Sequence, residues 1–449
     1  MFNALNGLGG AGLLSPQTAS ESNTAVYLSF FISSFVGCGV INLCGVRYPS
    51  ALACLTYALH TGSYIVYRHT YNGAFPVAAG AMMGMGAGVL WTSQGVVMVS
   101  YPRENQKGLF MAVFNVIFNA GGLVGAVVPF ALDFYSKGLS DSVYIIIAGL
   151  QCMGALAALC LAAPGLVVRN DGSHATILQR NSAAQEILEV LRLFKNRWML
   201  LLVPMYYTSN AYLAYQFIHF NGALFTLRTR AFNNILYWSS QIIGSLVLSA
   251  LLDFSRWTRK TRGLSAVAAI FLTFNAVWAC ALLLQIRFTR GGSNTDYPGG
   301  QIDFLETPRA AGPIFLYFAM GVVDSWYQNM AYWIIGTLTS DSYITARYVG
   351  FYKGIQSLGA AISWQISAQN AGYMDQLIGN WILFGLSLPT VIYTVMHIKD
   401  RALDDQLVYL SPKGNMSNLI SDSEMDLSLN TAMMTPRLPP ARRYLGQII

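Results

Sequence analysis

This chain of 449 residues has few charged residues, few cysteines and few histidines. Only 10% of its residues are charged, whereas a soluble chain carries roughly a quarter. Its six cysteines fall in apolar stretches, too widely spread for a metal motif or a disulfide framework. Its five histidines are equally scattered, and we find no nucleotide-binding loop and no nucleophile elbow. These absences argue against an enzyme and indicate no cofactor and no metal site.

Apolar residues are abundant instead and make up 54% of the chain. A helix needs roughly 20 apolar residues to cross about 30 Å of hydrocarbon, and eleven segments reach that length. We therefore predict an all-α integral membrane protein in the lipid bilayer. The predicted spans are 24–46, 50–69, 74–100, 109–132, 143–167, 199–218, 231–253, 264–284, 313–338, 348–368 and 377–398.

The basic residues predict the orientation of these spans, because positive charge stays on the cytoplasmic side. Outside the spans, nineteen Lys and Arg residues fall on the side of the C-terminal tail and seven on the other. The tail is therefore predicted to be cytoplasmic. The net charge of +7 reflects this topology and does not indicate a nucleic-acid partner. The sequence does not distinguish the plasma membrane from an endosomal or vacuolar membrane.

A polar stretch at 169–198 separates five spans from six. Within it, 183–194 has Leu and Ile at helical spacing, which predicts a short amphipathic helix on the membrane surface. Such a linker is typical of the major facilitator type, with two six-helix bundles related as parallel repeats. We predict an N-terminal bundle (1–168), this linker, a C-terminal bundle (199–398) and a disordered cytoplasmic tail (399–449).

The first bundle has one span too few for that pattern. We interpret the glycine-rich opening MFNALNGLGGAG as the extracellular end of a first helix whose body is missing from the chain, as if the start were placed too late. A twelve-helix fold without that helix would lack one wall of its cavity.

Two loops form a weak internal repeat. GVINLCGVR contains Asn42 and Arg47, and the equivalent SALLDFSR in the second half contains Asp253 and Arg256. Both resemble the loop signature of the major facilitator superfamily, in which an acid and a basic cluster pair across a cytoplasmic gate. The resemblance implies a gate at these four residues, although Asn42 replaces the acid. The alternative is a generic basic cytoplasmic loop.

Charged residues inside the spans are costly and usually functional. Asp324 lies roughly 16 Å along its predicted helix, near the middle of the bilayer, and Gln328 follows one turn later. We predict that Asp324 is a proton or cation site, or half of an ion pair with Lys353 in the next span. The alternative for Lys353 is that its side chain extends to the cytoplasmic surface.

Uncharged polar residues extend this set. Tyr207 and Asn210 lie in a tyrosine-rich span and, with Gln216, are expected to face a wet cavity. Gln94 needs a partner at its depth in the membrane. Asn115 and Asn119 are candidates for that partner, unless they hold neighbouring helices together.

Several strings are similar to those of one family. They are NALNGLGGAG, LWTSQG, VVRNDGS, YWIIGTL and ARYVGFYKGIQSLGAA. They resemble the Unc-ninety-three-like branch of the major facilitator superfamily, most of all its fungal members. The resemblance implies a twelve-helix fold whose first, fourth, seventh and tenth helices line a cavity. Counted this way, the cavity helices carry Gln94, Tyr207, Asn210, Asp324 and Gln328. Animal members act largely as regulators of potassium channels or as escorts for membrane receptors.

Two functions follow as hypotheses. The first is a transporter that moves a small solute or ion by alternating access, with Asp324 as its charge-bearing site. The second is a non-transporting regulator or escort that binds a membrane protein partner through its helices. Gly80, Gly84 and Gly88 repeat every four residues, a spacing that lets a neighbouring helix approach closely and slightly favours the second hypothesis. The polar lining favours the first.

Overall fold

The computed structural model describes nine stretches of the chain. The predicted tail at 399–449 lies outside them. The described residues are 1–10, 15–101, 107–136, 138–162, 166–168, 182–254, 256–287, 300–339 and 342–398.

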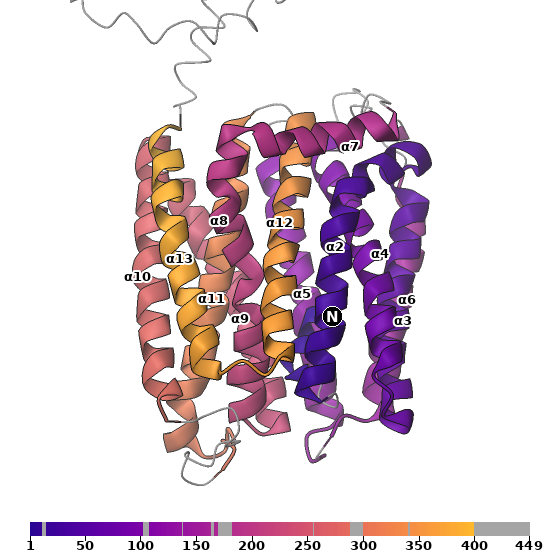
Figure 1. Ribbon diagram of the computed structural model, residues 1–449, viewed down its shortest axis with the longest axis vertical. Helices are drawn as coiled ribbons and strands as arrows, with labels where there is room; N and C mark the ends of the chain where they lie inside the picture. Colours follow the sequence, from indigo (N-terminus) through magenta and orange to yellow (C-terminus); the bar gives the residue numbers. More distant parts are fainter. Residues whose placement is uncertain are drawn as a thin grey trace, which may run out of the picture. The chain divides into compact units, whose positions relative to one another are not determined.

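The described part of the chain is helical, which confirms the all-α prediction (Figure 1). Ten predicted spans each overlap one long helix, and the span 199–218 is divided between a helix that ends at Ala211 and a π-helix that begins at Tyr215. The N-terminal half contains α1 (Phe2–Gly7), α2 (Pro16–Cys44), α3 (Arg47–Thr70), α4 (Ala74–Ser100), α5 (Lys107–Leu132) and α6 (Asp141–Leu159). The linker region contains α7 (Ala183–Arg192) and the 3-10 turn η4 (Leu193–Lys195). The C-terminal half contains α8 (Arg197–Ala211), the π-helix η5 (Tyr215–Gly222), α9 (Leu227–Leu252), α10 (Arg259–Gln285), α11 (Thr307–Leu338), α12 (Ser342–Ala368) and α13 (Tyr373–Met396).

Seven helices of the described residues are long and apolar enough to span a membrane by length and composition. They are α2, α4, α5, α6, α9, α10 and α13. The long helices α11 and α12 fall outside this set. Their polar residues reduce the average hydropathy, and these are the residues that form the site described below.

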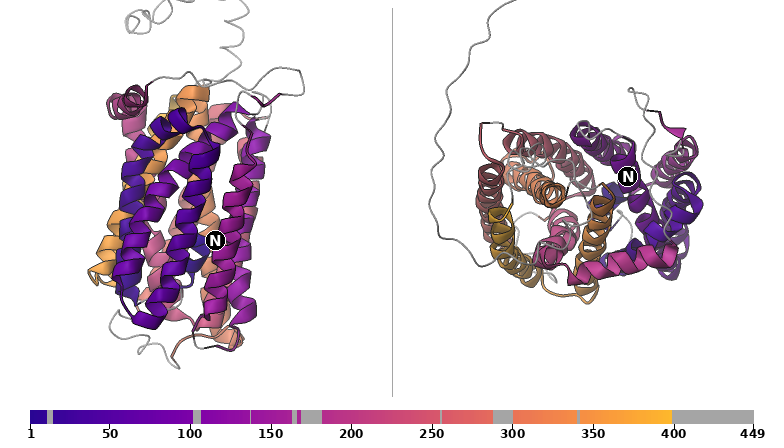
Figure 2. Two further views of the ribbon diagram at one scale, coloured as in Figure 1. Left: turned by 90° about the vertical axis from the view of Figure 1, so that its right-hand side faces the viewer. Right: turned by 90° about the horizontal axis from the view of Figure 1, so that it is seen from above.

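The helices pack within each half and along two seams between the halves. In the N-terminal half α2 packs on α4, and α3 packs on α4 and α6. In the C-terminal half α9 packs on α11, and α8 packs on α12 and α13. The seams between the halves are α2 with α12 and α5 with α9. Figure 2 shows the helices of the two halves side by side, seen from a second side and from above.

The glycine repeat of α4 lies in the interface with α2. A Cβ atom added at Gly84 would collide with the carbonyl oxygen of Val26 and the hydroxyl of Ser29. One at Gly88 would collide with Ser33, whose hydroxyl donates to the carbonyl oxygen of Gly84 at 3.1 Å. The small residues therefore serve packing inside the chain, and they no longer favour a partner protein.

The short helix α7 lies across one end of the long helices (Figure 1). Its Glu186 is 2% exposed and pairs with Arg347 of α12 at 3.0 Å. After α7, the ring of Phe194 contacts Phe35 of α2 and Phe351 of α12. The linker thus contacts both halves at that end.

The first helix provides a second link between the halves. The carbonyl oxygen of Gly7 accepts a hydrogen bond from Asn221 at 2.7 Å, and that of Ala4 accepts one from Asn234 of α9. Asn6 donates to Asn23 of α2 at 2.9 Å. Although α1 has only six residues, it therefore joins the two halves and forms part of the cavity wall.

Candidate functional site

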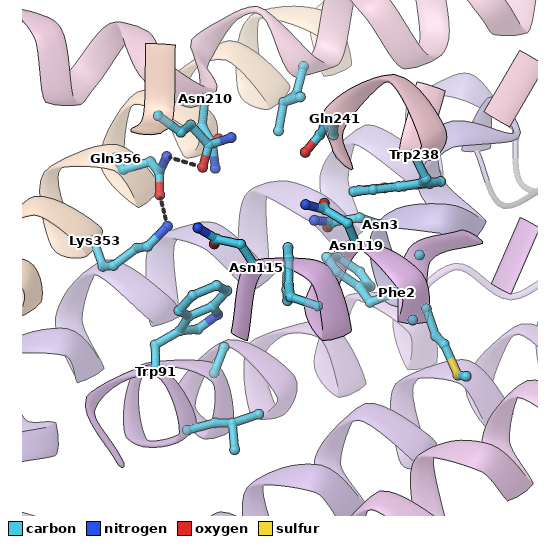
Figure 3. Close-up of a pocket in the computed structure, with 18 of the residues that line it drawn as sticks. Phe2, Asn3, Trp91, Asn115, Asn119, Asn210, Trp238, Gln241, Lys353 and Gln356 are labelled. Atoms are coloured by element: carbon cyan, nitrogen blue, oxygen red, sulfur yellow. Dashed lines mark hydrogen bonds between the residues drawn. The ribbon is translucent and has the colours of Figure 1, made fainter. Parts of the chain in front are cut away.

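A cavity of about 370 Å³ lies between the two halves (Figure 3). One wall comes from α1 to α6, and the other comes from α8, η5, α9, α11 and α12. Pockets for small molecules typically have volumes of about 300–1,000 Å³. The cavity therefore fits a small molecule.

Asp324 lies near the middle of α11 and is 2% exposed. Its Oδ1 accepts hydrogen bonds from the hydroxyl of Tyr212 at 2.8 Å and from Nε2 of Gln328 at 2.7 Å. Its Oδ2 accepts from Tyr237 at 2.9 Å and from Nε2 of Gln241 at 2.7 Å. A carboxylate has about four acceptor positions, so these four donors occupy its capacity.

Lys353 lies on α12 and is 5% exposed. Its Nζ donates to Oε1 of Gln356 at 2.8 Å. The same atom lies 4.4 Å from the ring centroid of Trp91, 5.0 Å from that of Tyr352 and 5.3 Å from that of Tyr332, within the range of cation–π attraction. Lys353 thus lines the cavity, and the alternative that it extends to the membrane surface is wrong.

Two amides connect these charged residues. Gln356 Nε2 donates to Oε1 of Gln328 at 3.2 Å, and Gln328 in turn donates to Asp324. No direct ion pair joins Asp324 to Lys353 among the described residues. The predicted pair is therefore linked through side-chain amides. The amides of Gln328 and Gln356 each both donate and accept a hydrogen bond. A change in the charge of Asp324 therefore affects the hydrogen bonds of Lys353, and the reverse also holds.

The hydroxyl of Tyr237 lies between two acceptors. It is 2.9 Å from Oδ2 of Asp324 and 2.9 Å from Oε1 of Gln216, but it carries one hydrogen. If Asp324 is protonated, it donates to Tyr237 and Tyr237 donates to Gln216. If Asp324 is ionised, Tyr237 donates to it. Within the described part of the structure, Nε2 of Gln216 has no partner. When Tyr237 donates to Asp324, the amide of Gln216 can turn by about 180° so that Nε2 donates to the hydroxyl oxygen of Tyr237. The site accommodates both protonation states.

The other predicted lining residues are only partly brought together. Asn210 lines the cavity, whereas Tyr207 and Gln94 do not. Tyr207 instead lies where α8 and α12 touch through their backbones, because a Cβ at Gly359 would collide with its carbonyl group. The side-chain oxygen of Gln94 has no partner among the described residues, so the expected bonds to asparagines are not formed.

The predicted gate residues lie at the end of the bundle that carries α7. Arg47, Asp253 and Arg256 are exposed, and the guanidinium of Arg47 lies 5.7 Å from the ring centroid of Tyr48. The side chain of Asn42 lies outside the described residues. Asp253 forms no ion pair within the described part of the chain. The cytoplasmic gate therefore stays a prediction.

Four residues of the site escaped sequence reasoning as site residues. Tyr237 and Gln241 come from α9, Tyr212 follows α8, and Gln356 comes from α12. Gln356 lies three residues after Lys353, so helical spacing could have placed the two on one face. The α9 residues gave no such signal, because their approach to Asp324 depends on how two helices pack.

Comparison with known proteins gives the family. The model of a family described as "Ion channel regulatory protein UNC-93" matches residues 14–369. UNC93-like protein 1 of Arabidopsis thaliana is 40% identical over 410 residues, which cover 90% of this chain and 88% of that protein. An UNC93-like protein of Schizosaccharomyces pombe is 36% identical over 417 residues, which cover 91% of this chain and 82% of that protein. The chain belongs to the UNC-93 family.

Solved structures show the fold of this UNC-93 family member. The xylose transporter XylE from E. coli, in a partially occluded inward-open conformation, matches with a TM-score of 0.58 and 10% identity. The match covers 89% of this chain and 93% of XylE. The fucose:proton symporter FucP of E. coli matches with a TM-score of 0.55 and 12% identity, covering 89% of this chain and 96% of FucP. The facilitator fold and the predicted family resemblance are confirmed.

Proposed function

We propose that this UNC-93 family member moves a small solute across a membrane by alternating access, with Asp324 as the ion-coupling residue. The observation that carries the proposal is a buried carboxylate and a buried ammonium, joined by two amides, on the wall of a cavity between two halves. Charged groups at such depth are costly and mark ion or substrate pathways. Alternating access moves one half against the other around a site in this position.

The hydrogen bonds around Asp324 favour a proton as the coupling ion. Four donors already occupy the two carboxylate oxygens, which leaves little room for a metal cation. A proton needs no additional ligand shell, and Tyr237 with Gln216 supports either state of the carboxyl group. We place α7 and the tail on the cytoplasmic side, in accordance with the excess of basic residues there.

The experiment is uptake into liposomes that contain the full chain. A proton gradient is imposed, and accumulation of labelled small solutes is measured for the wild type and for Asp324→Asn. We expect the variant to fold and to lose gradient-driven accumulation, because Asn keeps the shape but cannot exchange a proton. Asp375→Asn is the matched control, since Asp375 is exposed on α13 and is not part of the cavity lining. Equal accumulation by Asp324→Asn and the wild type, or no flux by the wild type across a broad panel, would contradict the proposal.

The family description supports a second candidate, a regulator or escort of an ion channel or receptor. Such a protein would co-purify with a specific membrane protein after crosslinking in its native membrane. Failure to recover a reproducible partner would argue against this function.

A further inference from the structure

The cavity presents one charged side chain to a solute, and it is a cation. Among the described residues of the cavity lining, Asp324 and Lys353 are the charged side chains. Asp324 has its oxygens filled by four donors. Lys353 has one oxygen acceptor, Gln356, and its remaining N–H groups face aromatic rings and the cavity (Figure 3). An ammonium has three donors, so Lys353 can bind a further acceptor.

Amide side chains from both halves line the cavity beside that ammonium. Figure 3 shows Asn115 of α5 and Asn210 of α8 on the same side of the cavity as Lys353 and Gln356. Within the described part of the chain, neither Asn115 nor Asn210 forms a side-chain hydrogen bond. Asn119 is 5% exposed, and its side-chain oxygen has no partner. Asn115 and Asn210 are only partly buried and border the cavity, so their amides are available to a polar ligand there. The buried oxygen of Asn119 would normally be paired.

Next to Lys353 and these amides, the cavity wall is aromatic. Trp91 contacts Lys353 and also packs against Phe118, with ring centroids 5.3 Å apart. Phe114 stacks on Phe118 at 6.0 Å. A ligand that extends from the ammonium along this wall would place an apolar or aromatic body against three rings, where ring–ring contacts are favourable.

We propose that the cavity binds a small aromatic monocarboxylate, whose carboxylate pairs with Lys353 and accepts from the amides of Asn115 and Asn210. This inference rests on the proposed transport function and names its substrate class. The carboxylate is held from both halves, because Asn115 belongs to the first half and Lys353 to the second. The aromatic body lies against Trp91 and Phe118. The volume of about 370 Å³ limits the ligand to a small molecule.

The test is equilibrium binding of radiolabelled benzoate to the purified full chain in lipid nanodiscs. We expect saturable binding that unlabelled benzoate and phenylacetate displace. Benzyl alcohol and benzylamine have similar bodies, but they lack the negative charge and should not displace it. Displacement by benzylamine as effective as that by benzoate would overturn the proposal, as would the absence of saturable benzoate binding.

Substitutions at Lys353 and Asn115 test whether benzoate binds at this part of the cavity. Lys353→Met keeps most of the side-chain length and removes the charge. We therefore expect its affinity for benzoate to fall by about tenfold or more relative to the wild type. Lys353→Arg should retain most of it. Lys195→Met, at an exposed lysine of the linker, is the matched control and should bind as the wild type does. If Lys353→Met does not fold, Asn115→Leu provides the same test with a smaller expected loss. Unchanged affinity in Lys353→Met or Asn115→Leu would overturn the assignment.

The binding and flux experiments can contradict the ligand class and the transport function independently. Benzoate binding without gradient-driven flux would leave the ligand class standing and contradict transport. Flux of another solute without benzoate binding would leave transport standing and contradict the ligand class.

Discussion

The two halves join equivalent helices by different means. In the N-terminal half α2 packs on α4, where glycines let the backbones approach and serine hydroxyls bond to carbonyl oxygens. In the C-terminal half α9 packs on α11, where Gly321 also allows a close approach, but side chains in addition bond to side chains around Asp324. Ser325 and Trp326 of α11 add bonds to the carbonyl oxygens of Gln241 and Gly244.

The two halves therefore contribute different parts of the site. The first half supplies a closely packed wall with rings and unpaired amides, such as Trp91 and Asn115. The second supplies the charges and the network that holds them. A mutation in the first interface should therefore act on packing, and one in the second should act on the charge of the site.

The largest expected effect is Gly84→Ala. The new methyl group would collide with the backbone of α2, and such overpacking costs about 3 kcal/mol. Gly95→Ala is the matched control on the same helix, because a Cβ there meets no atom within 4 Å. Since Ala favours a helix over Gly, the control should be neutral or stabilised by up to about 1 kcal/mol. Thermal unfolding in detergent measures both, and equal effects would contradict the packing role.

The sequence predicted eleven helical segments from their length, apolar composition and flanking charge, and seven helices of the described residues are long and apolar enough to span a membrane. The boundaries were less accurate. Helix α11 begins at Thr307 although its predicted span began at 313, and α6 ends at Leu159 although its span was extended to 167. Hydropathy locates the part of a helix in hydrocarbon, so it missed the first residues of α11 in the interface. It extended the span of α6 over the apolar residues after Leu159, because hydropathy does not detect where a helix ends.

A site residue could be predicted from the sequence where its depth in the membrane alone marks it as unusual. It was harder to predict where the rotation of its helix determines whether the side chain points to the cavity. Asp324 stands out because a carboxylate near mid-membrane needs partners. Gln94 is also a polar residue inside a predicted span, but it lies outside the cavity lining although Trp91 of the same helix lies in it. Hydropathy does not fix which face of a helix surrounded by apolar neighbours points to the cavity. That is decided by packing, as by the glycines that set α4 against α2.

An intermediate effect is expected for Gln241→Leu in the second interface. The change removes one of four donors to a buried carboxylate, which costs about 1–2 kcal/mol. In the Asp324→Asn background the cost should be smaller, because a neutral amide depends less on that donor. A double-mutant cycle of thermal stability measures this coupling. The same cost in both backgrounds would show that Gln241 acts by packing.

The smallest expected effects are at two ion pairs at the end opposite α7. In the first half Arg68 pairs with Asp141 at 2.9 Å, and both side chains are about one-third exposed. In the second half Arg228 pairs with Asp303 at 2.6 Å, and the Asp303 side chain is 10% exposed. Burial raises the pKa of Asp303, but hydrogen bonds from Arg228, the backbone of Leu305 and Thr226 lower it by more. Its pKa therefore lies below its ordinary value.

A lowered pKa fixes the pH dependence of this pair. The stabilisation is present above the unfolded-state pKa of about 3.9 and is lost as the pH falls through the folded-state value. We expect Asp303→Asn to cost on the order of 1 kcal/mol near neutral pH and progressively less below about pH 4. Asp141→Asn should cost less, because exposed pairs contribute about 0–1 kcal/mol. Thermal unfolding from pH 7 to pH 3 measures both. If the cost of Asp303→Asn did not change with pH, its bonds would not depend on its charge, and the two halves would not differ at this end.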